Sequence, residues 1–231
     1  MGTLLVTGAN RGLGLEFARQ YAAEGWQVHA TCRDPGAADE LRELATGSGG
    51  RIAVIALDVT NRASVSAAAA SLSGTPIDLL INNAGVGSPL GQRLGALDYA
   101  AWARVLDVNT LGPMRVTEAF LNHLAASGEA KVVTITSGMG SIADNSSGGS
   151  YAYRSSKAAV NMVVKSLSLD LASRGITCIA INPGWVRTDM GGPGGKISPE
   201  ESIAAMRKVI TKLKLADSGK FFDYDGGNYP W

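Results

Sequence analysis

Two residues in the second half of the chain have the types and the spacing needed for proton transfer. Tyr153 and Lys157 lie four positions apart in the run YAYRSSK, residues 151–157, which opens a long segment with an apolar face. In a helix, residues at this spacing lie one turn apart on the same face, so the ammonium would approach the phenol hydroxyl. A nearby cation stabilises a phenolate and lowers the pKa of a tyrosine from its usual value of ~10. The pair therefore predicts a general acid or base that works near neutral pH.

The same spacing also has a simpler interpretation. A tyrosine and a lysine one helical turn apart are more often an exposed pair that stabilises the helix by about 0.2–0.5 kcal/mol. Tyr151 is a weaker candidate for the acid, because Ser155 rather than a cation follows it by four positions. The elements that would position Tyr153 must therefore decide between the two interpretations.

A glycine-rich turn near the amino terminus predicts a dinucleotide site. A short apolar run, residues 4–6, is followed by TGANRGLG, residues 7–14, and then by apolar residues at helical spacing over residues 13–23. Glycines between a strand and a helix let the backbone approach a pyrophosphate, and the amides at the helix start favour its negative charge. An ordinary tight turn is the alternative, but the position after the first strand favours nucleotide binding. The glycines concerned are Gly8, Gly12 and Gly14.

The end of the second predicted strand bears on the choice of cofactor. Cys32 ends the apolar run of residues 28–32, and Arg33 and Asp34 follow it. At this place an acid binds the ribose 2′-hydroxyl of NAD, whereas an arginine accommodates the 2′-phosphate of NADP. Arg33 and Arg11 could converge on a phosphate, which favours NADPH. Asp34 lies about 20 residues beyond Gly14, the interval expected of a ribose-binding acid, so NADH stays an alternative.

Apolar strands alternate with helical segments along the whole chain. We predict strands at residues 3–7, 28–32, 52–57, 77–81, 131–136, 176–181 and 220–224. Helices are predicted at residues 13–23, 35–46, 61–72, within 97–124, over 151–174 and from 198 onward, where Ser198 and Glu201 can form a capping box. Continuous apolar strands separated by helices indicate a parallel sheet that is covered on both faces.

The predicted fold is therefore of the α/β class, with a doubly wound (Rossmann-type), mainly parallel seven-stranded sheet and helices on both faces. Residues 1–231 are expected to form a single domain. Ligands of such sheets bind beyond the carboxyl ends of the strands, where Gly8, Arg33, Asp58 and Asn83 all fall.

Composition excludes several classes of function. The 231 residues carry 21 basic and 20 acidic side chains without a clustered basic run, which argues against nucleic acid as the main partner. Cys32 and Cys178 lie in apolar segments without metal-ligand spacing, so we expect buried thiols in a reducing compartment. No basic leader or membrane-length apolar run is apparent, and a cytoplasmic protein without a membrane partner is expected.

The ordered motifs resemble one enzyme family over essentially the full chain. The sequence is similar to short-chain dehydrogenases/reductases through TGANRGLG (7–14), LDV (57–59), NNAG (82–85), Asn109, Ser137, YRSSK (153–157) and NPG (182–184). Each motif is modest alone, but together and in this order they are specific. The runs TCRDP, GSIADN and FFDYDG further resemble the carbonyl-reductase subgroup that includes bacterial C-factor and insect sniffer.

This resemblance implies four catalytic residues. Tyr153 would protonate the carbonyl oxygen, and Lys157 would lower the pKa of Tyr153 and hydrogen-bond the nicotinamide ribose. Ser137 would hold the substrate oxygen, and Asn109 would keep a water in a proton relay behind Lys157. Hydride transfer makes the carbonyl oxygen negative, so a hydroxyl donor and an acidic phenol aimed at it would favour the transition state without a metal.

The resemblance also implies where the cofactor binds. The pyrophosphate turn would be Gly8, Asn10, Gly12, Leu13 and Gly14; the adenine contacts Asp58 and Val59; the ribose floor Asn83, Ala84 and Gly85; and the nicotinamide contacts Tyr153, Lys157, Pro183, Gly184, Val186 and Thr188. Residues 1–136 would thus be mainly the cofactor-binding part, and residues 137–231 the catalytic and substrate part.

The position of the catalytic serine departs from the family pattern. Ser137 precedes Tyr153 by sixteen positions and Ser141 by twelve, and the family's usual interval lies between the two. Ser137 is preferred because it closes the predicted fifth strand, which leaves an extended loop after it.

The set as a whole predicts NADPH-dependent reduction of a ketone or aldehyde, reversible as alcohol oxidation. A cofactor-binding signalling or regulatory protein of the same fold is one alternative. A dehydratase or epimerase is another, although the chain leaves little room for the extra domain that sugar-nucleotide substrates usually require.

The predicted pocket wall is Met139, Gly140, Ile142, Tyr151, Trp185 and Met190, and residues 191–195 suggest a mobile lid. The helices at residues 97–124 and 153–174 resemble those that pair between subunits, so a homodimer or homotetramer is expected.

Overall fold

Seven parallel strands form one sheet in the computed structural model, which describes residues 2–87 and 92–231. The strands are β1 (Thr3–Val6), β2 (Gln27–Cys32), β3 (Ile52–Ala56), β4 (Leu79–Asn82), β5 (Lys131–Ile135), β6 (Thr177–Asn182) and β7 (Phe221–Asp223). Their order is β3-β2-β1-β4-β5-β6-β7, and each neighbouring pair is parallel. The predicted doubly wound α/β fold in a single domain is confirmed.

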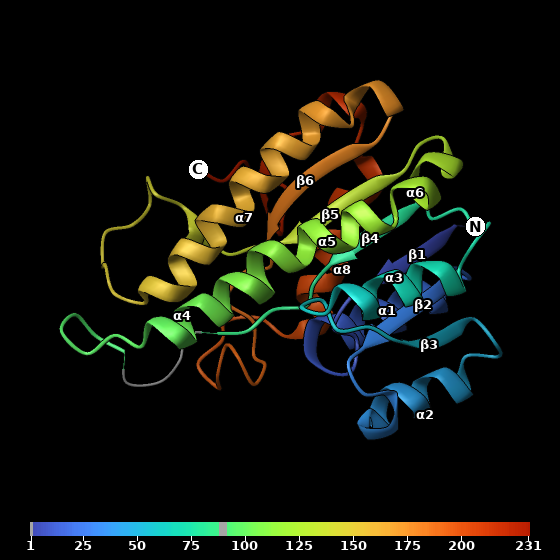
Figure 1. The fold of residues 1–231 in the computed structure, drawn as a ribbon, viewed down its shortest axis with the longest axis horizontal. Coiled ribbons are helices and arrows are strands. Elements are labelled where there is room, and N and C mark those ends of the chain that lie inside the picture. Colours follow the sequence, from blue (N-terminus) through green and yellow to red (C-terminus); the bar gives the residue numbers. More distant parts are fainter. Residues whose placement is uncertain (1, 88–91) are drawn as a thin grey trace.

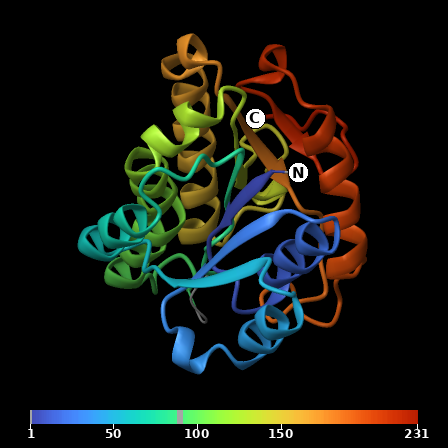
Figure 2. The same cartoon turned by 90° about the vertical axis from the view of Figure 1, so that its right-hand side faces the viewer.

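Helices cover both faces of this sheet (Figure 1). One layer contains α1 (Gly12–Ala23), α2 (Asp39–Gly47) and α8 (Pro199–Lys212). The other contains α3 (Arg62–Ser71), α4 (Tyr99–Leu106), α5 (Gly112–Ala119), α6 (Leu121–Ser127) and α7 (Tyr151–Asp170). Figure 2 shows the sheet between the two layers, with α4 to α7 in green to orange on one side and α1 and α8 in blue and red on the other.

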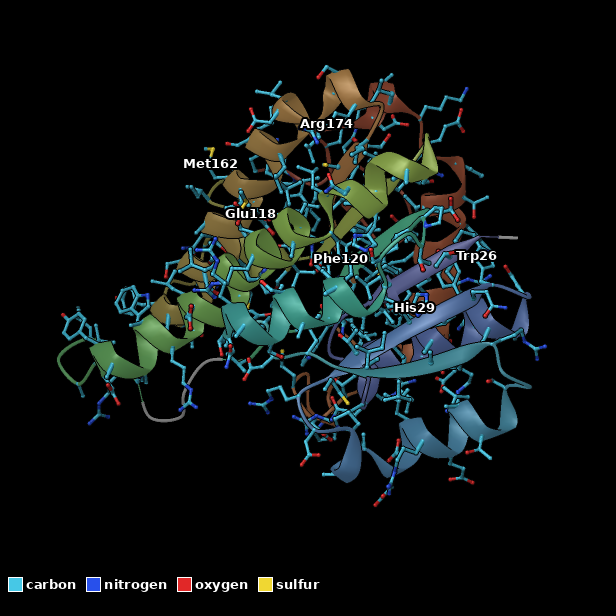
Figure 3. The ribbon with its side chains drawn as sticks, turned by 45° about the vertical axis from the view of Figure 1, so that its right-hand side comes forward. Trp26, His29, Glu118, Phe120, Met162 and Arg174 are labelled. Atoms are coloured by element: carbon cyan, nitrogen blue, oxygen red, sulfur yellow. The ribbon has the colours of Figure 1, made fainter. Side chains whose placement is uncertain are left out.

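The sheet has a hydrophobic core on each face. Phe17 of α1 and Met206 of α8 are fully buried in the first core, and Phe120 and Leu80 are fully buried in the second. Phe120 faces the sheet, whereas Met162 of α7 lies on the outer side of the same layer (Figure 3). Because apolar surface is removed from water on both faces, the strands read as continuous apolar runs in the sequence.

The strand order reverses beside β1, and this reversal positions the site. The chain moves outward from β1 to β3 and then crosses back to β4 on the opposite side of β1. The carboxyl ends of β1 and β4 are therefore neighbours, and the amide of Thr7 donates to the Ile81 carbonyl over 3.0 Å. In doubly wound sheets the crevice at such a reversal is where ligands bind.

The helical region predicted within residues 97–124 is one helical run over residues 99–119, with a π turn in its middle, followed by the short helix α6. After α4, residues Asp107–Leu111 form one π-helical turn, and α5 then begins with Pro113 in its first turn. A proline has no amide to donate, so the helical hydrogen-bond pattern is disturbed there. A π turn places an extra residue in the helix, and such turns are frequent at functional sites. Asn109 lies within this turn.

Smaller predictions can also be compared with the structure. The capping box between Ser198 and Glu201 at the start of α8 is present, and Cys32 and Cys178 are buried free thiols. A short 3-10 turn, Pro35–Ala37, precedes α2, where a continuous helix was expected. Over residues 2–87 and 92–231, every helix is too short or too polar to cross a membrane.

Candidate active site

Tyr153 and Lys157 lie on the inner part of α7, close to the end of β5. Lys157 is only 6% exposed, and its Nζ donates a hydrogen bond to the Ile135 carbonyl over 2.9 Å. The same Nζ lies 5.7 Å from the centroid of the Tyr153 ring. The exposed-pair interpretation of this spacing therefore does not hold, because the lysine is buried and attached to the sheet.

The electrostatics of the pair differ from the prediction. Lys157 was expected to lower the pKa of Tyr153, but burial raises the pKa of Tyr153 above its usual value, with the Ser137 hydrogen bond opposing the rise. Burial also lowers the pKa of Lys157 from 10.5 to about 8. Desolvation disfavours the charged form of both groups. At neutral pH Tyr153 is therefore protonated and able to donate a proton.

The structure distinguishes between the two candidate serines. The Ser137 side chain lies close enough to the Tyr153 side chain to lower its pKa, and the Ser137 hydroxyl accepts from the Met139 amide over 3.1 Å. Ser141 is buried away from the tyrosine, where its hydroxyl donates to the Trp231 carbonyl over 3.2 Å and accepts from the Asp144 amide over 3.0 Å. Ser137 is thus the serine that the fold brings to Tyr153.

Asn109 occupies a buried polar position behind Lys157. Its side chain exchanges two hydrogen bonds with the backbone of Val86, accepting over 2.8 Å and donating over 2.9 Å, and it donates to the Ser156 hydroxyl over 3.0 Å. An asparagine inside a helix is usually exposed, but this side chain is 1% exposed. It connects the segment after β4 to α7 and so fixes the wall of the site between them.

The glycine turn is held by a residue that sequence reasoning did not single out. The Thr7 hydroxyl accepts from the amides of Asn83 and Ala84, each over 3.0 Å, while the Asn83 side chain donates to the carbonyls of Thr7 and Gly8. A Cβ added at Gly14 would lie 2.2 Å from the Gly8 carbonyl oxygen, so no side chain fits there. The motif TGANRGLG contained Thr7, and its position at the end of β1 was the available signal.

The charged residues predicted to bind the adenosine part of the cofactor, Arg11, Arg33 and Asp34, are exposed. The Arg11 guanidinium is 70% exposed and forms a 2.7 Å ion pair with Asp189. Arg33 is exposed and acts on Asp58, whose pKa is lowered because hydrogen bonds from Thr60 and the Arg33 charge outweigh its burial. Asp34 accepts from the Gly36 amide over 2.9 Å and caps the Pro35–Ala37 turn.

We expected Arg11 and Arg33 to converge on one phosphate, but the ion pair with Asp189 competes with a phosphate for Arg11. Asp58 itself is fixed by the amide and hydroxyl of Thr60, over 2.9 and 2.7 Å. Val59 is mostly buried and packs against Gly112 at the start of α5. Arg33 and Asp58 therefore lie close enough at the strand ends for the charge of one to affect the other.

The segment after β6 comes close to the glycine turn. A Cβ added at Gly12 would lie 3.7 Å from the Thr188 side chain. A Cβ added at Gly85 would lie 3.9 Å from Lys157 Nζ. Gly184 has a φ of +80°, and the Pro183 carbonyl accepts from the Ser202 hydroxyl over 2.6 Å. Residues 183–188 and the turn 8–14 therefore border the same crevice as Lys157.

The predicted pocket wall is divided by the structure. Trp185 and Met190 are each 54% exposed, and a Cβ at Gly87 would lie 3.5 Å from Met190 Cγ, so these side chains border the open crevice. Ile142 is exposed and Met139 is partly buried on the loop after Ser137.

Two other predicted wall residues face neighbouring helices instead. Gly140 packs against the backbone of Lys157, where an added Cβ would lie 2.8 Å from the carbonyl carbon. The Tyr151 ring lies 6.3 Å from that of Trp102 on α4. On a helix, Tyr151 and Tyr153 point to different sides because they are two positions apart.

The predicted lid residues are attached to their own loop. Trp185 Nε1 donates to the Gly191 carbonyl over 2.8 Å, and the Gly192 amide donates to the Thr188 carbonyl over 2.8 Å. Cavities of about 520 and 340 Å³ lie between α8 and β7 and between α3 and α6, and neither is lined by Tyr153 or Lys157. The candidate site is therefore identified by its buried polar groups at the strand ends and not by the volume of a cavity.

Comparison with known proteins agrees with this geometry. A family model described as short chain dehydrogenase matches residues 2–196. The chain belongs to the short chain dehydrogenase family. It is thus an NAD(P)-dependent oxidoreductase of that family, as predicted from its motifs.

Two curated relatives extend the match. The C-signal protein of Myxococcus xanthus is 50% identical over 156 residues, which are 68% of this chain and 93% of that protein. The 1-hydroxy-2-glutathionyl-2-methyl-3-butene dehydrogenase of Rhodococcus sp. (strain AD45) is 39% identical over the full length of both chains.

Solved structures show the same fold over the whole chain. The carbonyl reductase Sniffer of D. melanogaster superposes with a TM-score of 0.93 at 33% identity and covers 100% of both chains. An NADPH-bound carbonyl reductase from chicken fatty liver superposes with a TM-score of 0.93 at 36% identity and covers 100% of this chain and 99% of that one. The predicted likeness to carbonyl reductases is confirmed.

Proposed function

We propose that this chain reduces a ketone or aldehyde to an alcohol with NADPH, reversibly, and that Tyr153 is the general acid and base. The observation that carries the proposal is the group formed by the partly buried Tyr153 and Ser137 and the buried Lys157 at the carboxyl end of β5. Similarity to an NADPH-bound carbonyl reductase supports both the cofactor and the reaction.

The residues present fit a dinucleotide. Within the described residues no side chain caps the start of α1, so the first amides of this helix are free to bind a pyrophosphate. Gly8 has a φ of +66°, and a Cβ added there would lie 2.9 Å from Ala84 Cα, so the turn requires glycine at this position. Residues 8–14, 58–59, 83–85 and 183–188 would hold the cofactor along the crevice.

Arg33 would favour the 2′-phosphate of NADPH. It is an exposed guanidinium at the end of β2, and a guanidinium matches phosphate oxygens with two parallel donors. Asp34 is already occupied as a turn cap, which supports NADPH over NADH. The Asp189 carboxylate competes for Arg11, so Arg33 would be the principal contact.

The chain's own residues would act on the substrate oxygen. When bound, the reduced nicotinamide supplies the hydride. Ser137 would donate a hydrogen bond to the carbonyl oxygen, and Tyr153 would transfer its phenolic proton to that oxygen as negative charge develops. Lys157 would stabilise the phenolate that results, and Asn109 would keep the segment after β4 in register with α7. In alcohol oxidation the same phenolate would accept the proton.

A signalling role without catalysis is the second candidate, and the relative named C-signal is the observation that favours it. The buried lysine argues against a role as a binder alone. Burying an ammonium lowers the pKa of Lys157 to about 8, and this disfavours the folded state at neutral pH. A protein that merely binds a dinucleotide would not need this arrangement.

We further propose a cytoplasmic homodimer or homotetramer. Exposed apolar side chains on α5 and α7 offer a helical surface for pairing, among them Met114, Met162 and Leu169. Both cysteines are free and buried, as expected in a reducing compartment.

The division into a cofactor part up to residue 136 and a catalytic part beyond it stays a prediction, and so do the roles of the individual site residues.

A substrate panel tests the function. Purified protein is mixed with ketones and aldehydes of increasing size and with NADPH or NADH, and the loss of reduced cofactor is followed by absorbance. We expect NADPH-dependent turnover of apolar carbonyls with formation of the matching alcohol. Binding of NADPH by calorimetry without turnover of any carbonyl would support the signalling alternative instead.

A further inference from the structure

Residues 229–231, the C-terminal segment, lie against the loop that follows Ser137. The Trp231 carbonyl oxygen accepts three hydrogen bonds from this loop: from the Ile142 amide over 3.1 Å, the Ala143 amide over 3.0 Å and the Ser141 hydroxyl over 3.2 Å. One carbonyl thus holds three consecutive residues of the segment 138–144, which we name the Ser137 loop.

Tyr229 makes a second contact with the same loop. Its hydroxyl donates to Asp144 Oδ2 over 3.0 Å. The hydroxyl also lies directly over Gly138, because a Cβ added there would be 2.3 Å from the Tyr229 oxygen. Gly138 is the residue after Ser137, so Tyr229 touches the backbone next to the proposed substrate-binding hydroxyl.

The C-terminal segment is itself anchored to the sheet. The rings of Tyr229 and Trp231 pack on Phe221 of β7, with centroids 4.9 and 5.4 Å away, and Phe221 is 2% exposed. The Tyr229 amide donates to the Phe221 carbonyl over 2.8 Å. The segment therefore transmits the position of β7 to the Ser137 loop.

The start of the loop has a separate attachment to the same strands. The Gly138 amide donates to Asn182 Oδ1 over 3.0 Å, and Asn182 Nδ2 donates to Asp223 Oδ1 over 2.8 Å. Both ends of the Ser137 loop thus depend on β6 and β7. Because Met139 and Ile142 belong to this loop, its position also decides where the substrate wall lies.

We propose that the C-terminal segment is a positioning element of the active site, which fixes the Ser137 loop so that Ser137 faces Tyr153 and the substrate wall is formed. This inference rests on the proposed function for its catalytic consequence. Tyr229 and the Trp231 carbonyl act through the loop, and neither is among the residues proposed to hold the cofactor.

Tyr229→Phe tests the proposal without removing the packed ring. Loss of the hydrogen bond to Asp144 should lower kcat/KM for the carbonyl substrate about three- to tenfold, while the Kd for NADPH and the Tm stay near their wild-type values. Asp144→Ala should have the same effect, and the double variant should be no worse than either single one, because the two residues form one interaction. Asp144→Asn keeps a carbonyl acceptor and should restore activity to within about twofold of wild type.

Tyr99→Phe is the matched control. Tyr99 is 72% exposed on α4, so removal of its hydroxyl should leave kcat/KM unchanged.

Hydrogen exchange supplies a readout that does not depend on turnover. Removal of residues 229–231 should make the Ile142 and Ala143 amides exchange about tenfold faster or more, with protection of β1 and β4 retained.

The outcomes separate this inference from the proposed function. If the wild-type protein reduces no carbonyl, the proposed function fails, and the exchange of Ile142 and Ala143 still decides whether the segment holds the loop. Equal loss of NADPH binding, Tm and activity in Tyr229→Phe would overturn the positioning role, as would unchanged kcat/KM with unchanged exchange. Additive losses in the Tyr229 and Asp144 variants would also contradict it.

Discussion

The charged groups at the two ends of the proposed cofactor crevice differ in how far they are exposed to water. At the adenosine end, Arg11 and Arg33 are exposed, and Arg11 is paired with an equally exposed Asp189. At the nicotinamide end, Lys157 is buried against β5, and Tyr153 beside it is partly buried. The first end can bind a phosphate through charges that stay hydrated, whereas the second alters the proton affinity of its groups through burial.

The energies of the two ends differ accordingly. An exposed ion pair such as Arg11 with Asp189 contributes about 0.2–1 kcal/mol. The lowered pKa of Lys157 corresponds to about 3 kcal/mol that disfavours the charged folded form. Substitutions at the nicotinamide end should therefore have large effects on catalysis and stability, and substitutions at the adenosine end should have graded effects on cofactor choice.

Tyr153→Phe should give the largest change. Removal of the proton donor is expected to lower kcat for carbonyl reduction by about 10²–10⁴, while NADPH affinity stays within a few fold, because the adenosine end is untouched. Steady-state turnover and calorimetric NADPH binding measure the two effects. Tyr151→Phe on the same helix is the control and should retain activity, and full activity in Tyr153→Phe would place the acid elsewhere.

Lys157→Met should change how stability depends on pH. In the wild type the folded pKa of Lys157 is about 8 and the unfolded value near 10.5, so the unfolded chain binds more protons between these limits. The free energy of unfolding of the wild type, relative to that of Lys157→Met, should therefore rise with pH from about 8 toward 10.5, by up to about 3 kcal/mol.

Urea unfolding of both proteins at several pH values gives this difference, and turnover should be lost in the variant. Lys165→Met is the matched control because Lys165 is exposed on the same helix, α7. A difference between wild type and Lys157→Met that does not vary with pH would show that the buried ammonium keeps an ordinary pKa.

Arg33→Asp should change cofactor choice by an intermediate amount. An acid at the end of β2 would repel a 2′-phosphate and accept from a 2′-hydroxyl, so the ratio of NADPH to NADH affinity should fall about tenfold or more. Binding of each reduced cofactor is measured by fluorescence titration, with Arg62→Asp, an exposed arginine at the start of α3, as the control for net charge. An unchanged ratio would remove Arg33 from the 2′-phosphate site.

Asp189→Asn should give the smallest effect. Loss of the carboxylate frees the Arg11 guanidinium, and NADPH affinity should rise by up to about fivefold, in proportion to an exposed ion pair. The gain should shrink as salt is added, because exposed charges are screened. Weaker NADPH binding in this variant would mean that the ion pair orders the glycine turn and does not compete with the cofactor.

Much of this arrangement was present in the local pattern of the sequence. Continuous apolar runs separated by helical segments gave the parallel sheet, and the strand-end positions of Gly8, Asp58 and Asn83 gave one edge for the site. The four-residue interval between Tyr153 and Lys157 gave a shared helix face. These features repeat with the period of a strand or a helix, so neighbouring residues are sufficient to reveal them.

Contacts between distant residues decided the rest. Burial reversed the expected direction of the Tyr153 pKa, and the partners of Ser137 and Ser141 assigned the serine that the spacing left open. Asp189 reached Arg11 across 178 positions of sequence, and Trp231 reached Ser141 across 90. Desolvation and hydrogen-bond partners depend on which elements the fold packs together, and that is a property of the tertiary structure that no local period contains.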